Sequence, residues 1–290
     1  MKIAFTSCSN AHQQLGNQPI WGIIHGQKPD LLLLLGDNVY IGEQPFVKAN
    51  LDARYTEQLN EIHFNTLISE VPFLAIWDNH DFGTPANVYG VDVPDQQHRE
   101  ARESFDFHLK SRSLKPDTEF VYCTHIMGDA KFYMLDVRSY QEAPGNRATT
   151  LGADQEKWLL DELAASTSKY NIICSGTTFS MSERSWTTYN RWSGKFLKAV
   201  NKVSRPLFLG GNMHSNGFKA HWSFSLFKFR YLYEVISSSV GRNGGDGLPD
   251  NKYGLIDINE KTGLVDIALY SQRPRNNIHR QIKISNWRVQ

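Results

Sequence analysis

The sequence lacks several features that would assign it to a class at once. It has three cysteines, Cys8, Cys123 and Cys174, and no Cys-x-x-Cys pair, so neither a disulfide framework nor a structural zinc site is expected. No run reaches the roughly 18 to 20 apolar residues that cross a bilayer. The N-terminus also turns polar at Thr6, too early for the apolar segment of a signal peptide. We therefore expect a cytoplasmic protein with no membrane partner.

Charge of one sign is also missing. The chain has 31 Lys+Arg against 30 Asp+Glu, so no overall field favours nucleic acid, and no sequence-specific nucleic-acid partner is expected. The Gly-x-Ser-x-Gly elbow of serine hydrolases is absent. The glycine-rich stretch 241–247, "GRNGGDG", lacks the Lys-Ser/Thr ending of a phosphate-binding loop, and we interpret it as a flexible loop at the mouth of a site. The oligomeric state stays open.

Apolar runs that end in polar or glycine-rich turns predict buried strands of an α/β fold. Helical spacing between them favours layered sheets with helices outside. The predicted strands are 2–8, 30–38, 73–79, 131–138, 171–177, 206–212 and 231–239, and the predicted helices are 18–27, 54–68, 97–110 and 153–166.

Two predicted hairpins, at 120–137 and 253–270, add antiparallel strands to the sheets. Without a repeat or a linker, we predict one domain over 1–290, to which 217–290 contributes C-terminal strands.

The predicted strands end in side chains that can bind metals. Cys8 follows the first strand, Asp37 and Tyr40 the second, and His214 a late one. The strand at 73–79 runs into Asp78-Asn79-His80-Asp81. Ligands gather where the carboxyl ends of such strands meet, so we expect these residues to lie together.

This mixture of donors suits two metal ions better than one. Thiolate, phenolate and imidazole favour iron, whereas amide and carboxylate oxygens suit a harder ion. Two ions can clamp a phosphate and generate hydroxide at neutral pH. Asp37 is the candidate bridge between them. Taken singly, Asp37 is more often a turn residue than a ligand, His214 more often a hydrogen-bonded histidine and Cys8 a core residue; the joint pattern favours the metal site.

These blocks resemble the alkaline phosphatase D-like (PhoD-like) family of the calcineurin-like metallophosphatase superfamily. The blocks are "FTSC", "LLLGDNVY", "IWDNHDFG", "LDVRSY", "LGADQEKWLLDEL" and "FLGGNMHS", in order from Phe5 to Ser215. The resemblance implies a four-layer α/β/β/α sandwich of two mixed sheets flanked by helices. It also implies a phosphoric ester hydrolase, acting as phosphodiesterase, phosphomonoesterase or both, that uses a binuclear centre and metal-bound hydroxide.

The resemblance also implies roles for single residues. Cys8, Tyr40 and His214 would bind Fe³⁺, Asn79 and Asn212 a divalent ion (Ca²⁺, Mn²⁺, Mg²⁺ or Zn²⁺), and Asp37 both. His80 would protonate the leaving oxygen or stabilise charge on the phosphoryl group. Asp78 and Asp81 would support His80 or the neighbouring backbone. The substrate would be a small phosphoester or a nucleotide-like molecule.

Arg138 is the candidate phosphate clamp, with an ion pair such as one to Asp136 as the alternative. Trp186 and Tyr189 would line the substrate entrance, or would only pack the helix that follows them.

Asn79 and Asn212 depart from the resemblance to the PhoD-like family, which implies carboxylates at both positions. The wider superfamily uses asparagine at the position of Asn79 and a histidine at that of Asn212. Two missing negative charges weaken the binding of a hard cation. The alternative hypothesis is therefore a metal- or phosphoester-binding homologue with impaired catalysis.

Overall fold

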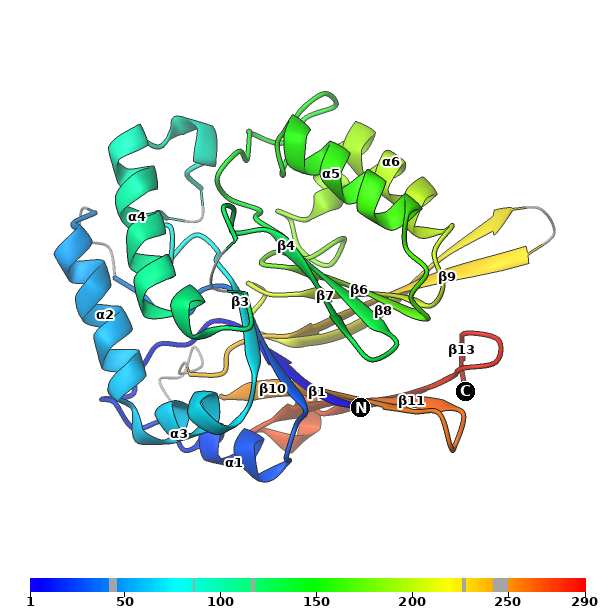
Figure 1. Cartoon of the computed structure of the whole chain (residues 1–290), viewed down its shortest axis with the longest axis horizontal. Helices are drawn as coiled ribbons and strands as arrows, with labels where there is room; N and C mark the ends of the chain where they lie inside the picture. Colours follow the sequence, from blue (N-terminus) through cyan, green and yellow to red (C-terminus); the bar gives the residue numbers. More distant parts are fainter. Residues whose placement is uncertain (42–45, 86, 116–117, 226–227, 242–249) are drawn as a thin grey trace.

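The computed structural model describes residues 1–41, 46–85, 87–115, 118–225, 228–241 and 250–290. Its strands form two sheets that pack face to face (Figure 1). The first has the order β13-β12-β11-β10-β1-β2-β3 and the second β4-β5-β6-β7-β9-β8. The first comprises β1 (Lys2–Thr6), β2 (Leu31–Leu35), β3 (Phe73–Ile76), β10 (Lys252–Asn259), β11 (Leu264–Ser271), β12 (Ile278–Lys283) and β13 (Arg288–Val289). The second comprises β4 (Cys123–Met127), β5 (Ala130–Met134), β6 (Tyr170–Ser175), β7 (Pro206–Gly210), β8 (Asn216–Ser225) and β9 (Lys228–Ser237).

Both sheets are mixed. Strands β1, β2 and β3 are parallel, as are β5, β6, β7 and β9, whereas β10 pairs antiparallel with β1 and β8 with β9. The predicted hairpins are β4–β5, which turns at Gly128, and β10–β11, which turns at Gly263.

The run of five leucines in β2 shows how the sheet builds two cores. Leu31, Leu33 and Leu35 face the second sheet, while Leu32 and Leu34 face the helices. All five are buried, since successive side chains of a strand point to opposite faces and both faces of this strand are covered.

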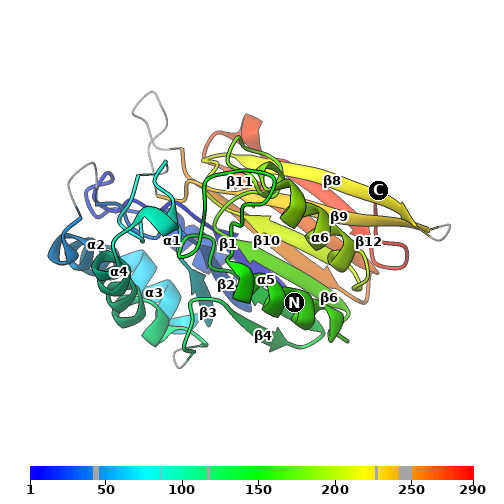
Figure 2. The ribbon, with the colours of Figure 1, turned by 90° about the horizontal axis from the view of Figure 1, so that it is seen from above.

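Helices cover the outer face of each sheet, which confirms the predicted α/β/β/α layering (Figures 1 and 2). On the first sheet lie α1 (Ile20–Gly26), α2 (Lys48–Asn60), α3 (Ile62–Glu70) and α4 (Asp95–His108), and on the second α5 (Ala153–Ala164) and α6 (Asn190–Val200). Short 3-10 turns are η1 (Gly90–Asp92), η2 (Lys110–Arg112), η3 (Trp186–Thr188) and η4 (Pro274–Asn276). Among the helices of the described residues, none has the length and apolar character needed to cross a membrane.

The predicted helix 54–68 is wrong in one respect, because it is two helices that break at Glu61. Glu61 has an extended backbone (φ −65°, ψ 119°), and its side chain accepts a hydrogen bond from the backbone N–H of Phe64 at 2.6 Å. A carboxylate that caps an N-terminus in this way starts a new helix.

Candidate metal centre

The loops after several strands meet at one edge of the two sheets. The N–H of Cys8 donates to the carbonyl of Gly36 at 3.1 Å, so the loops that follow β1 and β2 run side by side. The loop after β7 joins them, because a Cβ added to Gly211 would lie 2.6 Å from the carbonyl oxygen of Leu35. The expected gathering of strand ends is therefore present in the structure.

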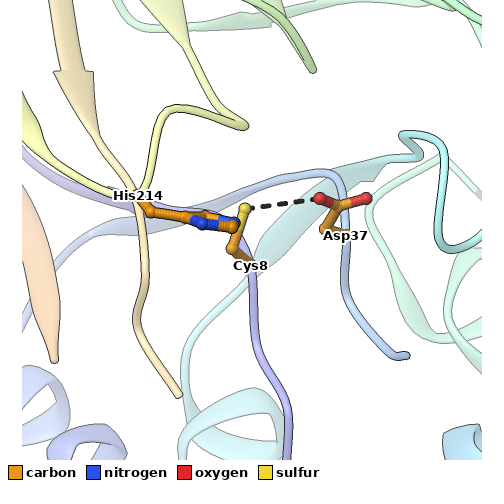
Figure 3. A group of neighbouring side chains, drawn as sticks. All are labelled: Cys8, Asp37 and His214. Carbon is orange, nitrogen blue, oxygen red and sulfur yellow. Dashed lines mark hydrogen bonds between the residues drawn. The ribbon is translucent and has the colours of Figure 1, made fainter. Parts of the chain in front are cut away.

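Cys8, Asp37 and His214 converge at this edge (Figure 3). One ligand atom of each, the thiol sulfur, a carboxylate oxygen and an imidazole nitrogen, lies within 4.8 Å of the others. The Sγ of Cys8 is 3.4 Å from Oδ2 of Asp37. The hydroxyl of Tyr40 is 3.2 Å from the same oxygen and 3.4 Å from Nε2 of His214. Four predicted ligands of the iron site thus share one small volume.

The two oxygens of Asp37 have different surroundings. Oδ2 faces Cys8 and Tyr40, whereas Oδ1 accepts the backbone N–H of His80 at 3.0 Å. The ring of His80 also packs on that of Tyr40, with centroids 3.9 Å apart. The Asp37 carboxylate therefore stands between the predicted iron ligands and the loop that carries Asn79.

The backbone around these residues is unusual. Cys8, Asp37, Asn212 and His214 all have positive φ, between 50° and 62°. Left-handed backbone costs a residue other than glycine roughly 1–2 kcal/mol. Such conformations cluster at functional sites, where the surrounding structure enforces them.

Asp81 is a buried carboxylate that accepts hydrogen bonds from the loops after β2 and β3. It accepts hydrogen bonds from the backbone N–H and the amide of Asn38, the backbone N–H of Asp78 and the hydroxyl of Tyr55. It holds the loops after β2 and β3 together. It supports backbone, as one of the two predictions for it states.

Arg138 is buried and its guanidinium is engaged. Its Nε pairs with Oδ1 of Asp78, Nη1 donates to Oε1 of Gln141 at 2.8 Å, and Nη2 lies 3.4 Å from Oδ1 of Asn79. The ion-pair alternative therefore describes this structure better than an open phosphate clamp.

The suggested partner Asp136 is wrong. Its carboxylate accepts instead from the indole of Trp77 at 2.7 Å and from the backbone N–H of Arg138. Asp78 pairs with Arg138 through Oδ1.

The electrostatics of the site favour a bound cation. Burial raises the pKa of Cys8 and of Asp37. Burial also raises the pKa of Asp78 to about 6, against the opposing effect of Arg138, and the pKa of Asp81 to about 7. Acidic groups held together away from water resist ionisation unless a positive charge joins them. With soft sulfur beside hard oxygen donors, this chain's residues fit metal ions.

A family comparison agrees with this geometry. The PhoD-like phosphatase family matches residues 3–278. The chain belongs to this family. It is 23% identical to alkaline phosphatase D of Bacillus subtilis (strain 168) over 86% of its own length and 52% of that protein's, so it spans about half of that relative. The resemblance to PhoD-like proteins, inferred from the motifs, is confirmed.

Solved structures align with much of the chain at low similarity. A 5′-nucleotidase from Candida albicans SC5314 is 14% identical with a TM-score of 0.42, covering 99% of this chain and 52% of that one. Vps29 in complex with zinc, from Entamoeba histolytica, is 8% identical with a TM-score of 0.39, covering 98% and 99%. Because these scores are low, the fold rests on the observed layers and strand order.

Trp186 and Tyr189 are not where a substrate entrance would need them. Both are buried, at 0% and 1% exposed. Trp186 packs edge-on against Phe196 and Phe208 beneath α6, and the hydroxyl of Tyr189 donates to the carbonyl of Glu142 at 2.8 Å. Their burial does not fit the prediction that they line an entrance, and the contacts of Trp186 under α6 agree with the packing alternative.

Two further predictions and one residue that the sequence did not suggest complete the site. Asn212 lies half-buried between Gly211 and His214. The predicted loop 241–247 lies outside the described residues except for Gly241. Ser238 was missed: its hydroxyl donates to Sγ of Cys8 at 3.2 Å and accepts from the backbone N–H of His214 at 3.1 Å. Its place at the end of the predicted strand 231–239 was the available signal.

Proposed function

We propose that this chain is a metal-dependent phosphoric ester hydrolase. The observation that carries the proposal is the cluster of Cys8, Asp37 and His214, whose ligand atoms lie within 4.8 Å of one another. The cluster stands at the strand ends of a PhoD-like phosphatase chain, where the similar protein from Bacillus subtilis bears the name alkaline phosphatase D.

The centre in this proposal is binuclear. Cys8, Tyr40 and His214 would hold Fe³⁺, Asn79 and Asn212 would hold a divalent ion such as Ca²⁺, Mn²⁺, Mg²⁺ or Zn²⁺, and Asp37 would serve both. When bound, such ions lower the pKa of water and neutralise charge on phosphoryl oxygens. The different surroundings of the two Asp37 oxygens support its double role.

His80 is proposed to protonate the leaving oxygen. The hydrogen bond from its backbone N–H to Asp37 and the contact of its ring with Tyr40 fix its place beside the cluster. It is half-buried, so a substrate can reach it while the protein orients the ring. The substrate class is a small phosphoester or nucleotide-like molecule.

Turnover of chromogenic phosphate esters tests the proposal. Protein loaded with iron plus calcium, manganese or zinc is assayed on p-nitrophenyl phosphate and on bis(p-nitrophenyl) phosphate, which separates monoesterase from diesterase activity. Asp37→Asn is expected to lose nearly all activity. Asp161→Asn, in an exposed ion pair with Lys157 on α5, serves as control and retains it. Folded, metal-loaded protein without turnover on either ester refutes the proposal.

The metal assignment has its own measurement. Elemental analysis gives the ions bound, and thiolate or phenolate ligation of ferric iron gives a visible charge-transfer band. A colourless, iron-free and fully active protein contradicts the roles given to Cys8 and Tyr40.

The rival function is a binding protein with impaired catalysis. The two amides, Asn79 and Asn212, favour it. It predicts that inorganic phosphate binds without ester turnover, and that carboxylates at both positions restore hydrolysis.

A further inference from the structure

Asn79 is held at both ends by Thr84. The side-chain Nδ2 of Asn79 donates to the carbonyl of Thr84 at 2.9 Å. In return the carbonyl of Asn79 accepts from the backbone N–H of Thr84 at 2.9 Å and from its hydroxyl at 3.3 Å. The amide nitrogen of Asn79 is therefore hydrogen-bonded to Thr84. This bond fixes the orientation of the amide oxygen.

Arg138 meets that oxygen from the other side. Its Nη2 lies 3.4 Å from Oδ1 of Asn79, while Nε pairs with Asp78 and Nη1 with Gln141. Arg138 is 2% exposed and Asp78 is 0% exposed. A buried guanidinium whose three nitrogens all contact protein groups is held in a fixed orientation beside Asn79.

A carboxylate does not fit at position 79. Asp has no hydrogen to donate to the Thr84 carbonyl, so two acceptors would face each other in a buried place. It would also add a charge beside the buried carboxylates of Asp37, Asp78 and Asp81, where Arg138 is already paired. The amide offers an oxygen to a metal without either penalty.

We propose that Arg138 is a positioning residue that, with Thr84, fixes the amide of Asn79 for the second metal ion, so that asparagine is the fitted residue there rather than a lesion. The inference rests on the proposed function in that it assumes a second ion. It assigns Arg138 to the metal site instead of to the phosphate.

Metal binding tests the inference without turnover. Protein stripped by a chelator and reloaded with iron is titrated with Mn²⁺ or Ca²⁺ by calorimetry. Arg138→Lys keeps the charge but loses the fork of three donors, and we expect about tenfold weaker binding of the second ion, as for other residues that orient a metal ligand. Arg102→Lys, which loses a similar fork to Asp106 and the Glu119 carbonyl away from the site, is the matched control with unchanged binding.

Kinetics distinguishes positioning from clamping. A positioning role lowers kcat in Arg138→Lys and leaves the inhibition constant of inorganic phosphate unchanged at saturating metal. If Arg138 is a phosphate clamp, Arg138→Lys instead raises the inhibition constant of phosphate and leaves the affinity for the second ion unchanged. That result overturns the inference. If Arg138→Lys does not fold, Asp78→Asn is used in its place. Asparagine keeps an oxygen acceptor for Nε of Arg138 but removes the negative charge of Asp78. We expect this variant to bind the second ion about as weakly as Arg138→Lys.

Asn79→Asp gives an independent outcome. We expect a lower unfolding temperature and no gain in turnover. Increased turnover overturns the inference and supports the impaired-homologue reading. Wild-type protein that binds no second ion also overturns it, whereas two bound ions without ester turnover refute the proposed function and leave the positioning of Asn79 standing.

Discussion

Gly211 packs closely against the ends of both sheets beside the metal centre, so an added methyl there would push the two sheets apart. A Cβ at this position would lie 2.6 Å from the carbonyl oxygen of Leu35, at the end of β2, and 2.7 Å from that of Gly176, just after β6. It would also lie 3.0 Å from Oγ of Ser7. The φ of Gly211 is not in the left-handed region, so the effect of Gly211→Ala comes from space alone.

The structure sets the size of the effect. Ordinary contact begins near 3.4 Å, so the distance to Leu35 must grow from 2.6 Å by 0.8 Å. The two nearest atoms are backbone and cannot rotate away. Overpacking of a rigid site costs about 1–3 kcal/mol, and we expect the upper end. For a chain of this size, each kcal/mol lowers Tm by about 2–4 °C. Because Ser7 and Leu35 lead into the loops of Cys8 and Asp37, metal content should fall as well.

Thermal and urea unfolding of the purified variant, with metal content by elemental analysis, measure both effects. The control is Gly194→Ala in α6, where an added Cβ has nothing within 4 Å. There alanine is expected to stabilise the helix by up to about 1 kcal/mol. If Gly211→Ala keeps the wild-type Tm and a full complement of metal, the two sheets do not meet at Gly211 as described.

Two further substitutions test the surroundings of the centre. Trp186→Ala, in the aromatic core under α6, should cost about 3–5 kcal/mol of unfolding free energy with KM unchanged in the folded enzyme; raised KM with unchanged stability would restore the entrance reading. Tyr55→Phe removes the donor to Oδ1 of Asp81 at 2.8 Å. In urea unfolding well above the pKa of Asp81 of about 7, where this carboxylate is ionised, it should cost about 1.5–3 kcal/mol, the range for a bond to a charged group. A change below about 0.5 kcal/mol, the usual effect of a surface substitution, contradicts the account of Asp81.

The layers of this fold could be predicted from the sequence because the local pattern of apolar residues agrees with the burial of each strand and helix in the structure. The leucines of β2 and the two hairpin turns carry their structure within a few residues. The helix break at Glu61 was not readable, since 54–68 has continuous helical spacing and the break depends on one cap. Helix α6 was anticipated only as a helix after the "SWTTY" segment, and β8 only as part of the C-terminal strands.

The metal cluster was predictable for a different reason. β1 and β2 are parallel neighbours, so their carboxyl ends place Cys8 beside Asp37. His214 follows β7 of the other sheet and reaches them because the two sheets pack face to face. The partner of Arg138 was not predictable, because Asp136 is two residues away in the chain whereas Asp78 is 60 away. The carboxylate of Asp136 accepts from Trp77 instead, and the fully buried Asp78 in the loop after β3 pairs with Arg138.

Backbone strain and side-chain chemistry together explain why this edge carries the residues it does. Glycine would relieve the left-handed backbone at Cys8, Asp37, Asn212 and His214, yet none of the four is glycine. A residue that occupies such a conformation at a cost of about 1–2 kcal/mol is retained for its side chain when the side chain makes a contact that glycine cannot. Three of the four form the metal cluster. Asn212 shares their backbone and loop, and asparagine tolerates left-handed backbone better than most residues. The left-handed backbone of Asn212 and its place two residues before His214 support the proposal that its amide, like that of Asn79, binds the second ion.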